Sequence, residues 1–277
     1  MRIFKVFGII ILLVFSCNSE IEESRYPMVT DPIDSNPVGL NESNSNITED
    51  ESSSENDTTS ENDTTSENDT TSENDTTSEN NATKSNYLAL GDSYTIGESV
   101  DEKERWPVQL VGLLNKSGYT FNAPKIIAET GWTTKELDAA IQREDIQQQF
   151  ELVSLLIGVN NQFRGRSLEE FRIEFGELLN KAIKFGFNDP SNVFVVSIPD
   201  WGVTPIGQDF GPVKISEEIN LFNEVVREES VKSKVRFVDI TDISREALNT
   251  EIYVANDNLH FSGAMYKLWV DEIVKGF

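Results

Sequence analysis

The stretch that decides the interpretation of this chain is Tyr87-Leu88-Ala89-Leu90-Gly91-Asp92-Ser93-Tyr94-Thr95-Ile96. Its first four residues form an apolar run without a helical period, and such a run bounded by glycine is typical of a buried strand. Gly91 allows the backbone to turn sharply, so Ser93 is expected at the carboxyl edge of the strand, where open α/β sheets bind ligands. Ser93 is therefore either a candidate nucleophile or part of a plain turn with a helix N-cap.

The single histidine of the chain, His260, favours the first interpretation. It lies in the polar segment Asp257-Asn258-Leu259-His260, where Asp257 can reach back and orient the imidazole. A serine hydroxyl needs a base of this kind because it is a poor nucleophile at neutral pH. We therefore expect Ser93 as nucleophile, His260 as base and Asp257 as the acid that orients it.

Two further apolar runs, 126–128 and 152–157, are each followed by a glycine-containing turn. Both are predicted strand-to-helix turns at the same sheet edge as Ser93. The first turn contains Gly131, and the second contains Asn160. A glycine N–H and an asparagine amide at that edge are suited to donate hydrogen bonds to a developing oxyanion. The predicted oxyanion hole thus comprises the N–H groups of Ser93 and Gly131 and the side chain of Asn160.

The order Ser93, Gly131, Asn160, His260 resembles the SGNH hydrolases, also called the GDSL esterase/lipase family. The resemblance covers residues 87–277. Two departures are visible: Asn161 stands where the family usually has Asp, and Phe261 stands where Pro is common. The resemblance implies a serine esterase that forms an acyl-enzyme and uses neither metal nor cofactor. With one His and one Cys, the chain also offers no His/Cys metal cluster.

Residues 87–277 alternate apolar runs with amphipathic stretches, which predicts an α/β domain with a parallel sheet covered on both faces. Helices are expected from 106 to 114, from Thr133 onward, and over 167–185, 215–226 and 262–274. Strands are expected over 193–198 and 235–239 in addition to those above. The resemblance implies five parallel strands in a flavodoxin-like order, within a three-layer α/β/α fold.

Three further side chains are candidates for substrate binding. Trp132 follows the predicted oxyanion glycine, and Trp201 follows the predicted strand 193–198, so either is placed to stack on a sugar ring or an acyl chain. The alternative is that each ring fills the core below a loop. Arg164 is a candidate for contact with an anionic group, although loop arginines are often simply solvated.

The N-terminus has the pattern of a secretory signal peptide. A basic start is followed by the apolar run 6–15, which is too short for a bilayer span, since a span needs about 20 residues. The run ends at Val14-Phe15-Ser16-Cys17, which resembles a bacterial lipobox. We expect cleavage before Cys17 and lipidation of its thiol, and hence an extracytoplasmic protein anchored to a membrane. The alternative is an ordinary signal peptide that happens to contain a cysteine.

Residues 18–86 are rich in Ser, Thr, Asn, Asp and Glu, a composition that buries too little apolar area to fold. The hexapeptide Ser-Glu-Asn-Asp-Thr-Thr begins at Ser54, Ser60, Ser66 and Ser72, and a degenerate copy follows at Ser78. We predict a disordered, acidic tether between the signal peptide (1–17) and the hydrolase domain (87–277).

Most of the acidity belongs to this tether. Residues 18–86 carry 18 acidic and 2 basic side chains, a net charge of −16, whereas residues 87–277 carry 30 acidic and 19 basic, a net charge of −11. An acidic folded part argues against nucleic acid as a partner. We expect instead a small-molecule or glycan ester, with short acyl groups on a carbohydrate or glycolipid. A lysophospholipase or thioesterase and a non-catalytic surface-binding module are the alternatives.

Overall fold

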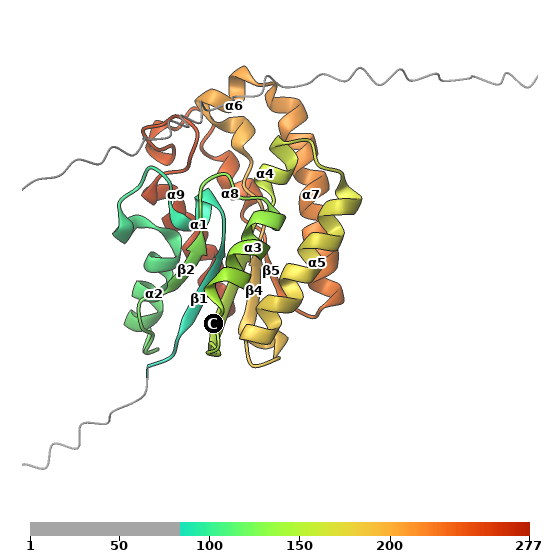
Figure 1. Ribbon diagram of the computed structural model, residues 1–277. Coiled ribbons are helices and arrows are strands. Elements are labelled where there is room, and N and C mark those ends of the chain that lie inside the picture. The colour runs from blue at the N-terminus through green and yellow to red at the C-terminus, as the bar shows by residue number, and fades with distance from the viewer. Residues whose placement is uncertain (1–83) are drawn as a thin grey trace, which may run out of the picture. The chain divides into compact units, whose positions relative to one another are not determined.

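The computed structural model describes residues 84–277, and the predicted signal peptide, Cys17 and the repeats lie outside the described residues. A parallel five-stranded sheet runs through the domain in the order β2-β1-β3-β4-β5 (Figure 1). The strands are β1 (Tyr87–Gly91), β2 (Lys125–Ala128), β3 (Leu152–Leu156), β4 (Val193–Val196) and β5 (Arg236–Val238). This order is the flavodoxin-like one, so the predicted fold class is confirmed.

The strand order reverses at β1, which has β2 on one side and β3 on the other. Leu90 of β1 lies level with Ile127 of β2 and Leu155 of β3. All three strands therefore end at the same edge, where the turns after them carry Ser93, Gly131 and Asn160. Ligands of open α/β sheets bind at the carboxyl ends of strands where the order reverses.

Helices cover both faces of the sheet (Figure 1). The α-helices are α1 (Ser93–Ile96), α2 (Trp106–Lys116), α3 (Thr134–Glu144), α4 (Val159–Phe163), α5 (Leu168–Phe185), α6 (Pro205–Asp209), α7 (Pro212–Lys232), α8 (Thr241–Arg245) and α9 (Gly263–Ile273). Short 3₁₀ turns are η1 (Glu102–Glu104), η2 (Pro190–Asn192), η3 (Trp201–Val203), η4 (Glu251–Tyr253) and η5 (Val274–Gly276). Helices α2 and α9 pack together, and α5 packs against α3 and α7.

Two helix starts are capped by side chains. Thr133 and Glu136 form a capping box at the start of α3, with the Thr133 N–H donating to Glu136 Oε2 at 2.6 Å. Ser167 caps α5 by accepting a hydrogen bond from the Glu170 N–H. Both caps use a side-chain oxygen to satisfy an N–H group that has no partner within its helix.

Helix α7 is longer than the predicted 215–226, because polar residues at its end are buried. Glu229 is only 7% exposed and pairs with Arg172 and Lys232, and Ser230 is fully buried and donates to the Val226 carbonyl. Arg172 belongs to α5, whereas Val226 and Lys232 belong to α7. Because these contacts satisfy the buried polar groups, the helix continues past residue 226, where its apolar pattern ends.

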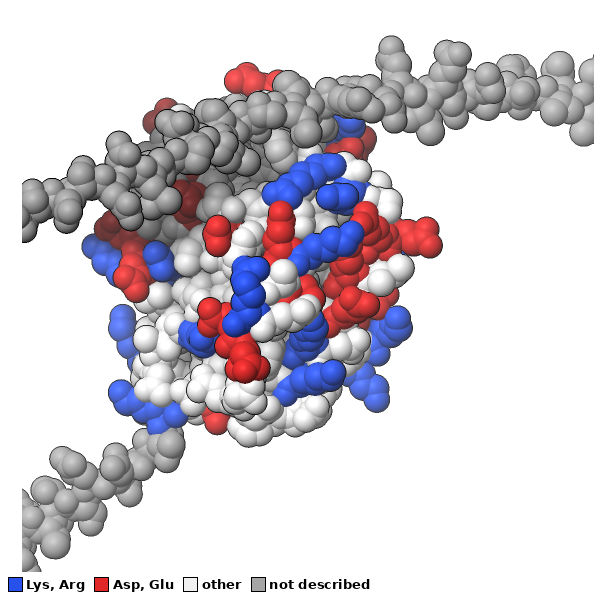
Figure 2. All heavy atoms as spheres, viewed as in Figure 1, with Lys and Arg blue, Asp and Glu red and all other residues white. Residues whose placement is uncertain are grey.

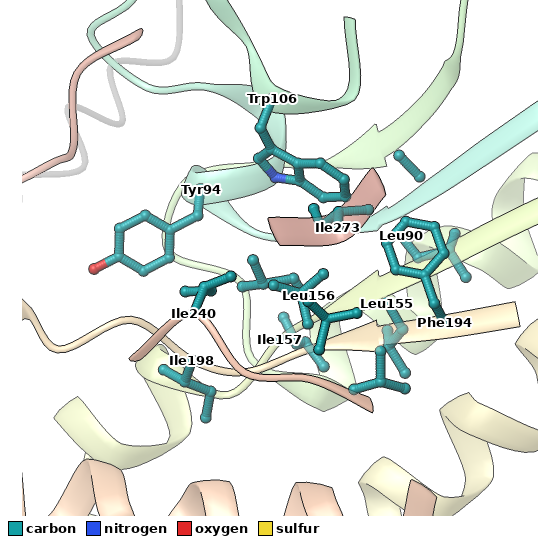
Figure 3. Packing of buried hydrophobic residues seen from close by; sticks show 14 of the residues in the cluster. Leu90, Tyr94, Trp106, Leu155, Leu156, Ile157, Phe194, Ile198, Ile240 and Ile273 are labelled. Atoms are coloured by element: carbon teal, nitrogen blue, oxygen red, sulfur yellow. The ribbon is translucent and has the colours of Figure 1, made fainter. Parts of the chain in front are cut away.

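The core lies on both sides of the central strands (Figure 3). The Trp106 ring of α2 packs edge-on against Phe194 of β4, with 6.3 Å between the ring centroids. Leu90 of β1, Leu155 of β3 and Ile273 of α9 are fully buried in the same core cluster. Full burial of such a side chain contributes about 1.5–3 kcal/mol each. This packing holds the strand ends, and therefore the turns that follow them, in fixed positions.

The domain begins slightly before the predicted boundary at residue 87. The Ser85 N–H donates to the Thr120 carbonyl at 2.8 Å, and the Asn86 N–H donates to Glu151 Oε2 at 2.6 Å. Residues 85 and 86, which we assigned to the tether, thus extend the edge of the folded domain. The polar side chains of Ser85 and Asn86 did not indicate that these residues belong to the domain, because the contacts are made mainly by backbone groups.

The charged residues of the domain are intermingled on the surface. On the face viewed in Figure 2, Lys and Arg lie beside Asp and Glu. Many form ion pairs, such as Lys135 with Glu170 and Lys267 with Asp271. Among the helices of residues 84–277, none has the length and apolar character that crossing a bilayer requires.

Candidate active site

The nucleophile turn is built by Gly91, Asp92 and Ser93, between β1 and α1. A Cβ on Gly91 would lie 2.5 Å from the Leu156 carbonyl oxygen and 2.1 Å from Thr95 Oγ1, so only glycine fits there. Asp92 caps α1, since its Oδ1 accepts from the Tyr94 N–H at 3.1 Å. Ser93 is thereby held at the first position of α1, 4% exposed, at the mouth of a cavity.

The side chains of His260 and Asp257 are joined by a short hydrogen bond. The imidazole Nδ1 lies 2.6 Å from Asp257 Oδ2, and Asp257 Oδ1 accepts the N–H groups of Leu259 and His260, both at 2.9 Å. Burial by itself would raise the pKa of the Asp257 carboxyl. The hydrogen bonds from Leu259, His260 and Ser99 outweigh this effect and lower the pKa to about 2. The carboxylate is therefore charged at neutral pH, and it favours the tautomer that leaves Nε2 as the base.

Ser93 and His260 line the same cavity. The edge of the Tyr94 ring packs against the imidazole, with 5.8 Å between the ring centroids. The hydrogen bonds within residues 84–277 do not include one between Ser93 Oγ and the imidazole. Catalytic hydrogen bonds are often long without substrate and tighten in the Michaelis complex.

The predicted oxyanion donors are exposed to the same cavity. Gly131 has φ +87°, a conformation that favours glycine, and its N–H, like that of Ser93, donates no hydrogen bond to any of residues 84–277. Asn160 donates one amide hydrogen to the Trp132 carbonyl at 2.9 Å. Its second amide hydrogen has no acceptor within the described part of the chain, so all three groups can serve an oxyanion.

The neighbouring Asn161 is used differently. Its side chain is 1% exposed, accepts the Thr134 N–H at 3.1 Å and donates to Thr134 Oγ1 at 2.7 Å. Asn161 therefore provides a hydrogen-bond acceptor for the backbone at the start of α3, and both the oxygen and the nitrogen of its amide are engaged. Of the two asparagines, only Asn160 lines the cavity.

Gly158 fixes the turn that carries Asn160. Its φ is +133°, and a Cβ there would meet Ile198 and the Phe171 ring at 2.7–2.9 Å. The residue therefore needs glycine for both its backbone conformation and the space around it. This turn places Asn160 against the cavity, while Val159 lines the cavity and also belongs to the buried core.

The cavity has a volume of about 200 Å³ and is mostly apolar. It is lined by Ser93, Tyr94, Thr130, Gly131, Val159, Asn160, Phe163, Trp201, Ile206, Phe210, Leu259 and His260. The Trp201 ring contacts both Phe163 and Phe210, at 5.8 and 6.2 Å between centroids, and its Nε1 donates to Gln162 Oε1 at 2.9 Å. These three rings form an aromatic wall beside the nucleophile.

Of the three substrate-binding candidates, only Trp201 lines this cavity. Trp132 is partly buried against the core and presents its carbonyl to Asn160. Arg164 donates to the Gly131 carbonyl at 2.6 Å and to Glu136 Oε1 at 2.9 Å. Arg164 therefore holds the turn of the oxyanion glycine.

Several residues at the site were not found by sequence reasoning. Phe163, Ile206, Phe210 and Leu259 line the cavity, and Ser99 donates to Asp257 Oδ2 at 2.7 Å. Leu259 directly precedes His260, and this position in the sequence could have identified it as a residue near the site. Ile206 and Phe210 lie in and just after α6, a five-residue helix without a motif. Their role depends on tertiary packing alone.

Asp92 has an unusual environment. It is fully buried, and its Oδ2 has no hydrogen-bond partner among residues 84–277. Burial raises the pKa of its carboxyl to about 7 in spite of N–H groups from Tyr94, its own backbone and Gly158. A buried carboxyl is disfavoured in its charged form. Asp92 therefore changes its charge near neutral pH while sitting next to the nucleophile.

Comparison with solved structures shows which known folds this domain resembles. The structure titled TesA matches with a TM-score of 0.56 and 17% identity, over 69% of this chain and 97% of TesA. The acetylxylan esterase Axe2 from Geobacillus stearothermophilus matches with a TM-score of 0.54 and 19% identity, over 69% and 93%. The esterase EstA from Pseudoalteromonas sp. matches with a TM-score of 0.51 and 17% identity, over 70% and 96%. At these identities the similarity shows the fold.

The family follows from the sequence profile. No curated protein matches the chain at a significant level. The model of the GDSL-like lipase/acylhydrolase family matches residues 89–268, which is more than half of the chain and spans the turns of Ser93, Gly131, Asn160 and His260. The chain therefore belongs to the GDSL-like lipase/acylhydrolase family and is a carboxylic ester hydrolase.

Proposed function

We propose that this protein hydrolyses carboxylic esters through a triad of Ser93, His260 and Asp257. The observation that carries the proposal is the hydrogen bond between Asp257 and His260, whose side chain lines the same cavity as Ser93. His260 Nε2 takes the hydroxyl proton as Ser93 Oγ attacks the ester carbonyl, and Asp257 stabilises the imidazolium that forms.

The tetrahedral intermediate places its negative oxygen toward the N–H groups of Ser93 and Gly131 and the free amide hydrogen of Asn160. Its collapse releases the alcohol, which takes the proton from His260, and leaves an acyl group on Ser93. Water then attacks the acyl-enzyme with His260 again acting as base, and the acid leaves. Negative charge builds on this oxygen in the transition states that lead to and from each tetrahedral intermediate, whereas the bound ester is neutral, so these donors lower the barrier rather than bind the substrate.

We propose further that the acyl group is short and that the alcohol is a carbohydrate or glycolipid. The cavity of about 200 Å³ has room for a small acyl group, and its lining by Val159, Trp201 and Ile206 suits an apolar one. Axe2, which shares this fold, is described as an acetylxylan esterase. The aromatic wall also offers a face on which a sugar ring can stack.

A panel of p-nitrophenyl esters from acetate to palmitate tests the acyl length, with acetylated xylo-oligosaccharides as the carbohydrate arm. The expected result is a maximum of kcat/KM at acetate to butyrate and release of acetate from the oligosaccharide. A maximum at decanoate or longer would overturn the short-acyl assignment. Absence of turnover on every ester would favour the alternative that the domain is a non-catalytic surface-binding module.

A lysophospholipase or thioesterase is the second candidate, because two aromatic rings of the cavity face solvent. Phe163 is 40% exposed and Phe210 is 38% exposed. Beyond the cavity, these rings would give a longer acyl chain an apolar surface. Rising kcat/KM with chain length, together with cleavage of lysophosphatidylcholine or an acyl thioester, would support this candidate.

A further inference from the structure

The segment Gly97-Glu98-Ser99 follows the nucleophile helix and has an unusual backbone. Gly97 ends α1 with φ +74°, and Ser99 has φ +62°, a left-handed conformation that a residue with a side chain adopts at a cost. The N–H groups of Gly97 and Glu98 both donate to the Ser93 carbonyl, at 3.0 and 2.9 Å. The segment is therefore tied directly to the nucleophile.

From this position, Ser99 reaches the acid of the triad. Its Oγ donates to Asp257 Oδ2 at 2.7 Å, and the same oxygen lies 2.6 Å from His260 Nδ1. Asp257 Oδ1 is occupied by the N–H groups of Leu259 and His260. The Ser99 hydroxyl is thus the one contact on this carboxylate that comes from outside the 257–260 segment among those formed by residues 84–277.

Glu98 reaches the other side of the cavity. Its carboxylate accepts the hydroxyl of Thr130, the residue directly before the oxyanion glycine Gly131. The Gly131 N–H belongs to the peptide between these two residues, so holding Thr130 limits how far that N–H can move. Thr130 itself lines the cavity.

We propose that Glu98 and Ser99 are positioning residues, which fix the oxyanion turn and the triad acid relative to Ser93. This inference rests on the proposed triad. The two side chains are adjacent in sequence, yet they bind segments that lie 32 and 158 positions away along the chain. Neither touches the reacting atoms. Their effect is to keep Asp257, and through it the imidazole, at a set distance from the hydroxyl that it must deprotonate.

The left-handed backbone of Ser99 allows an experiment that distinguishes a positioning role from a purely structural one. Glycine adopts φ +62° without a penalty, so Ser99→Gly relieves the strain while it removes the hydroxyl. If residue 99 only forms a turn, Ser99→Gly keeps full activity. If the hydroxyl positions Asp257, the variant loses activity without losing stability.

The first experiment therefore compares wild type with Ser99→Gly in the full-length chain, on a soluble p-nitrophenyl ester. We expect kcat to fall by about tenfold, KM to stay within about twofold, and the thermal midpoint to stay equal or rise. Unchanged kcat would overturn the role of Ser99. A fall in kcat accompanied by a lower midpoint would also count against it, because the loss would then follow destabilisation.

A double-mutant cycle asks whether Ser99 acts through Asp257. In the Asp257→Ala background, Ser99→Gly should cause no further loss of kcat, because the group that it positions is gone. Two independent, multiplying losses would contradict the inference. If Asp257→Ala alone keeps wild-type kcat, the proposed triad itself fails, which separates that outcome from failure of the present inference.

For Glu98, Glu98→Gln is the matched control, because its amide oxygen still accepts the Thr130 hydroxyl. Glu98→Ala should lower kcat several-fold at constant KM, and Glu98→Gln should retain most of the activity. The loss from Glu98→Ala should disappear when Thr130 is already replaced by Val. Equal activity of the Ala and Gln variants, or additive losses with Thr130→Val, would show that Glu98 does not hold the oxyanion turn.

Discussion

Asn161 and Thr134 bind each other at two points: the Thr134 N–H donates to Asn161 Oδ1, and Asn161 Nδ2 donates to Thr134 Oγ1. This pairing buries the second asparagine of the Gly158-Val159-Asn160-Asn161 turn against α3. The first asparagine is left beside Ser93 with one amide hydrogen free. The two adjacent amides therefore have separable roles.

Replacement of Asn160 by alanine should lower kcat by roughly 10²–10³, about 2.7–4 kcal/mol, with little change in KM, because the amide serves the oxyanion mainly in the transition state. Steady-state kinetics on p-nitrophenyl acetate measure this. The control is Asn161→Ala, which should mainly lower the thermal midpoint, since it leaves the buried start of α3 without its partner. If the two variants exchange these effects, Asn161 is the donor.

Replacement of Ser93 by alanine should lower kcat by about 10⁴ or more while the far-UV circular dichroism stays unchanged, because the acyl-enzyme can no longer form. A fluorophosphonate probe should label wild type at Ser93, as read by peptide mass spectrometry. Turnover that survives the substitution, or a label on another serine, would disprove the assignment.

Asp92→Asn should change how stability depends on pH. The pKa of Asp92 is raised in the folded protein to about 7, from an ordinary value of 3.8, so the folded state binds the proton more tightly than the unfolded state. The wild type should therefore lose stability as pH rises from 4 to 7, whereas the asparagine variant, which can still cap α1, should not show this loss.

Urea unfolding of both proteins at pH 5 and pH 8 checks this. The variant should be the more stable of the two at pH 8, and its advantage should shrink at pH 5. A pH-independent difference between the two proteins would mean that the Asp92 carboxyl does not titrate in this range.

Membrane attachment is predicted to depend on Cys17. The wild type should incorporate labelled palmitate and sediment with membranes, because several acyl chains hold a protein on a bilayer where a single chain does not. Cys17→Ser should be released into the soluble fraction. Recovery of soluble wild type with an N-terminus at residue 18 or later would refute the lipoprotein assignment.

The hexapeptide repeats are predicted to be dispensable for chemistry. Deletion of residues 54–77 should change kcat/KM on a small soluble ester by less than about twofold, since these repeats contain no large apolar side chains with which to contact the site. Comparison of the deleted and full-length proteins on the same ester measures the effect. A large loss would indicate that the repeats bind the domain.

Strand ends and their motifs were predictable because both depend on local sequence. The apolar run before Gly91 fixes β1, and the capping pattern of Thr133 and Glu136 fixes the start of α3. The positions of Phe210 and Ser99 were not predictable, since each contacts the site across a long stretch of chain. The end of α7 was also missed, because the burial of Glu229 depends on Arg172 of another helix.

The reversal of strand order at β1 has a consequence for how this enzyme can lose activity. The groups assembled at the sheet edge follow β1, β2 and β3 and precede α9, so they come from segments spread along most of the domain. No single hairpin or helix pair carries a working subset of them. Turnover thus requires the cooperatively folded whole, and a truncated or partly folded domain is expected to lose esterase activity completely rather than in part.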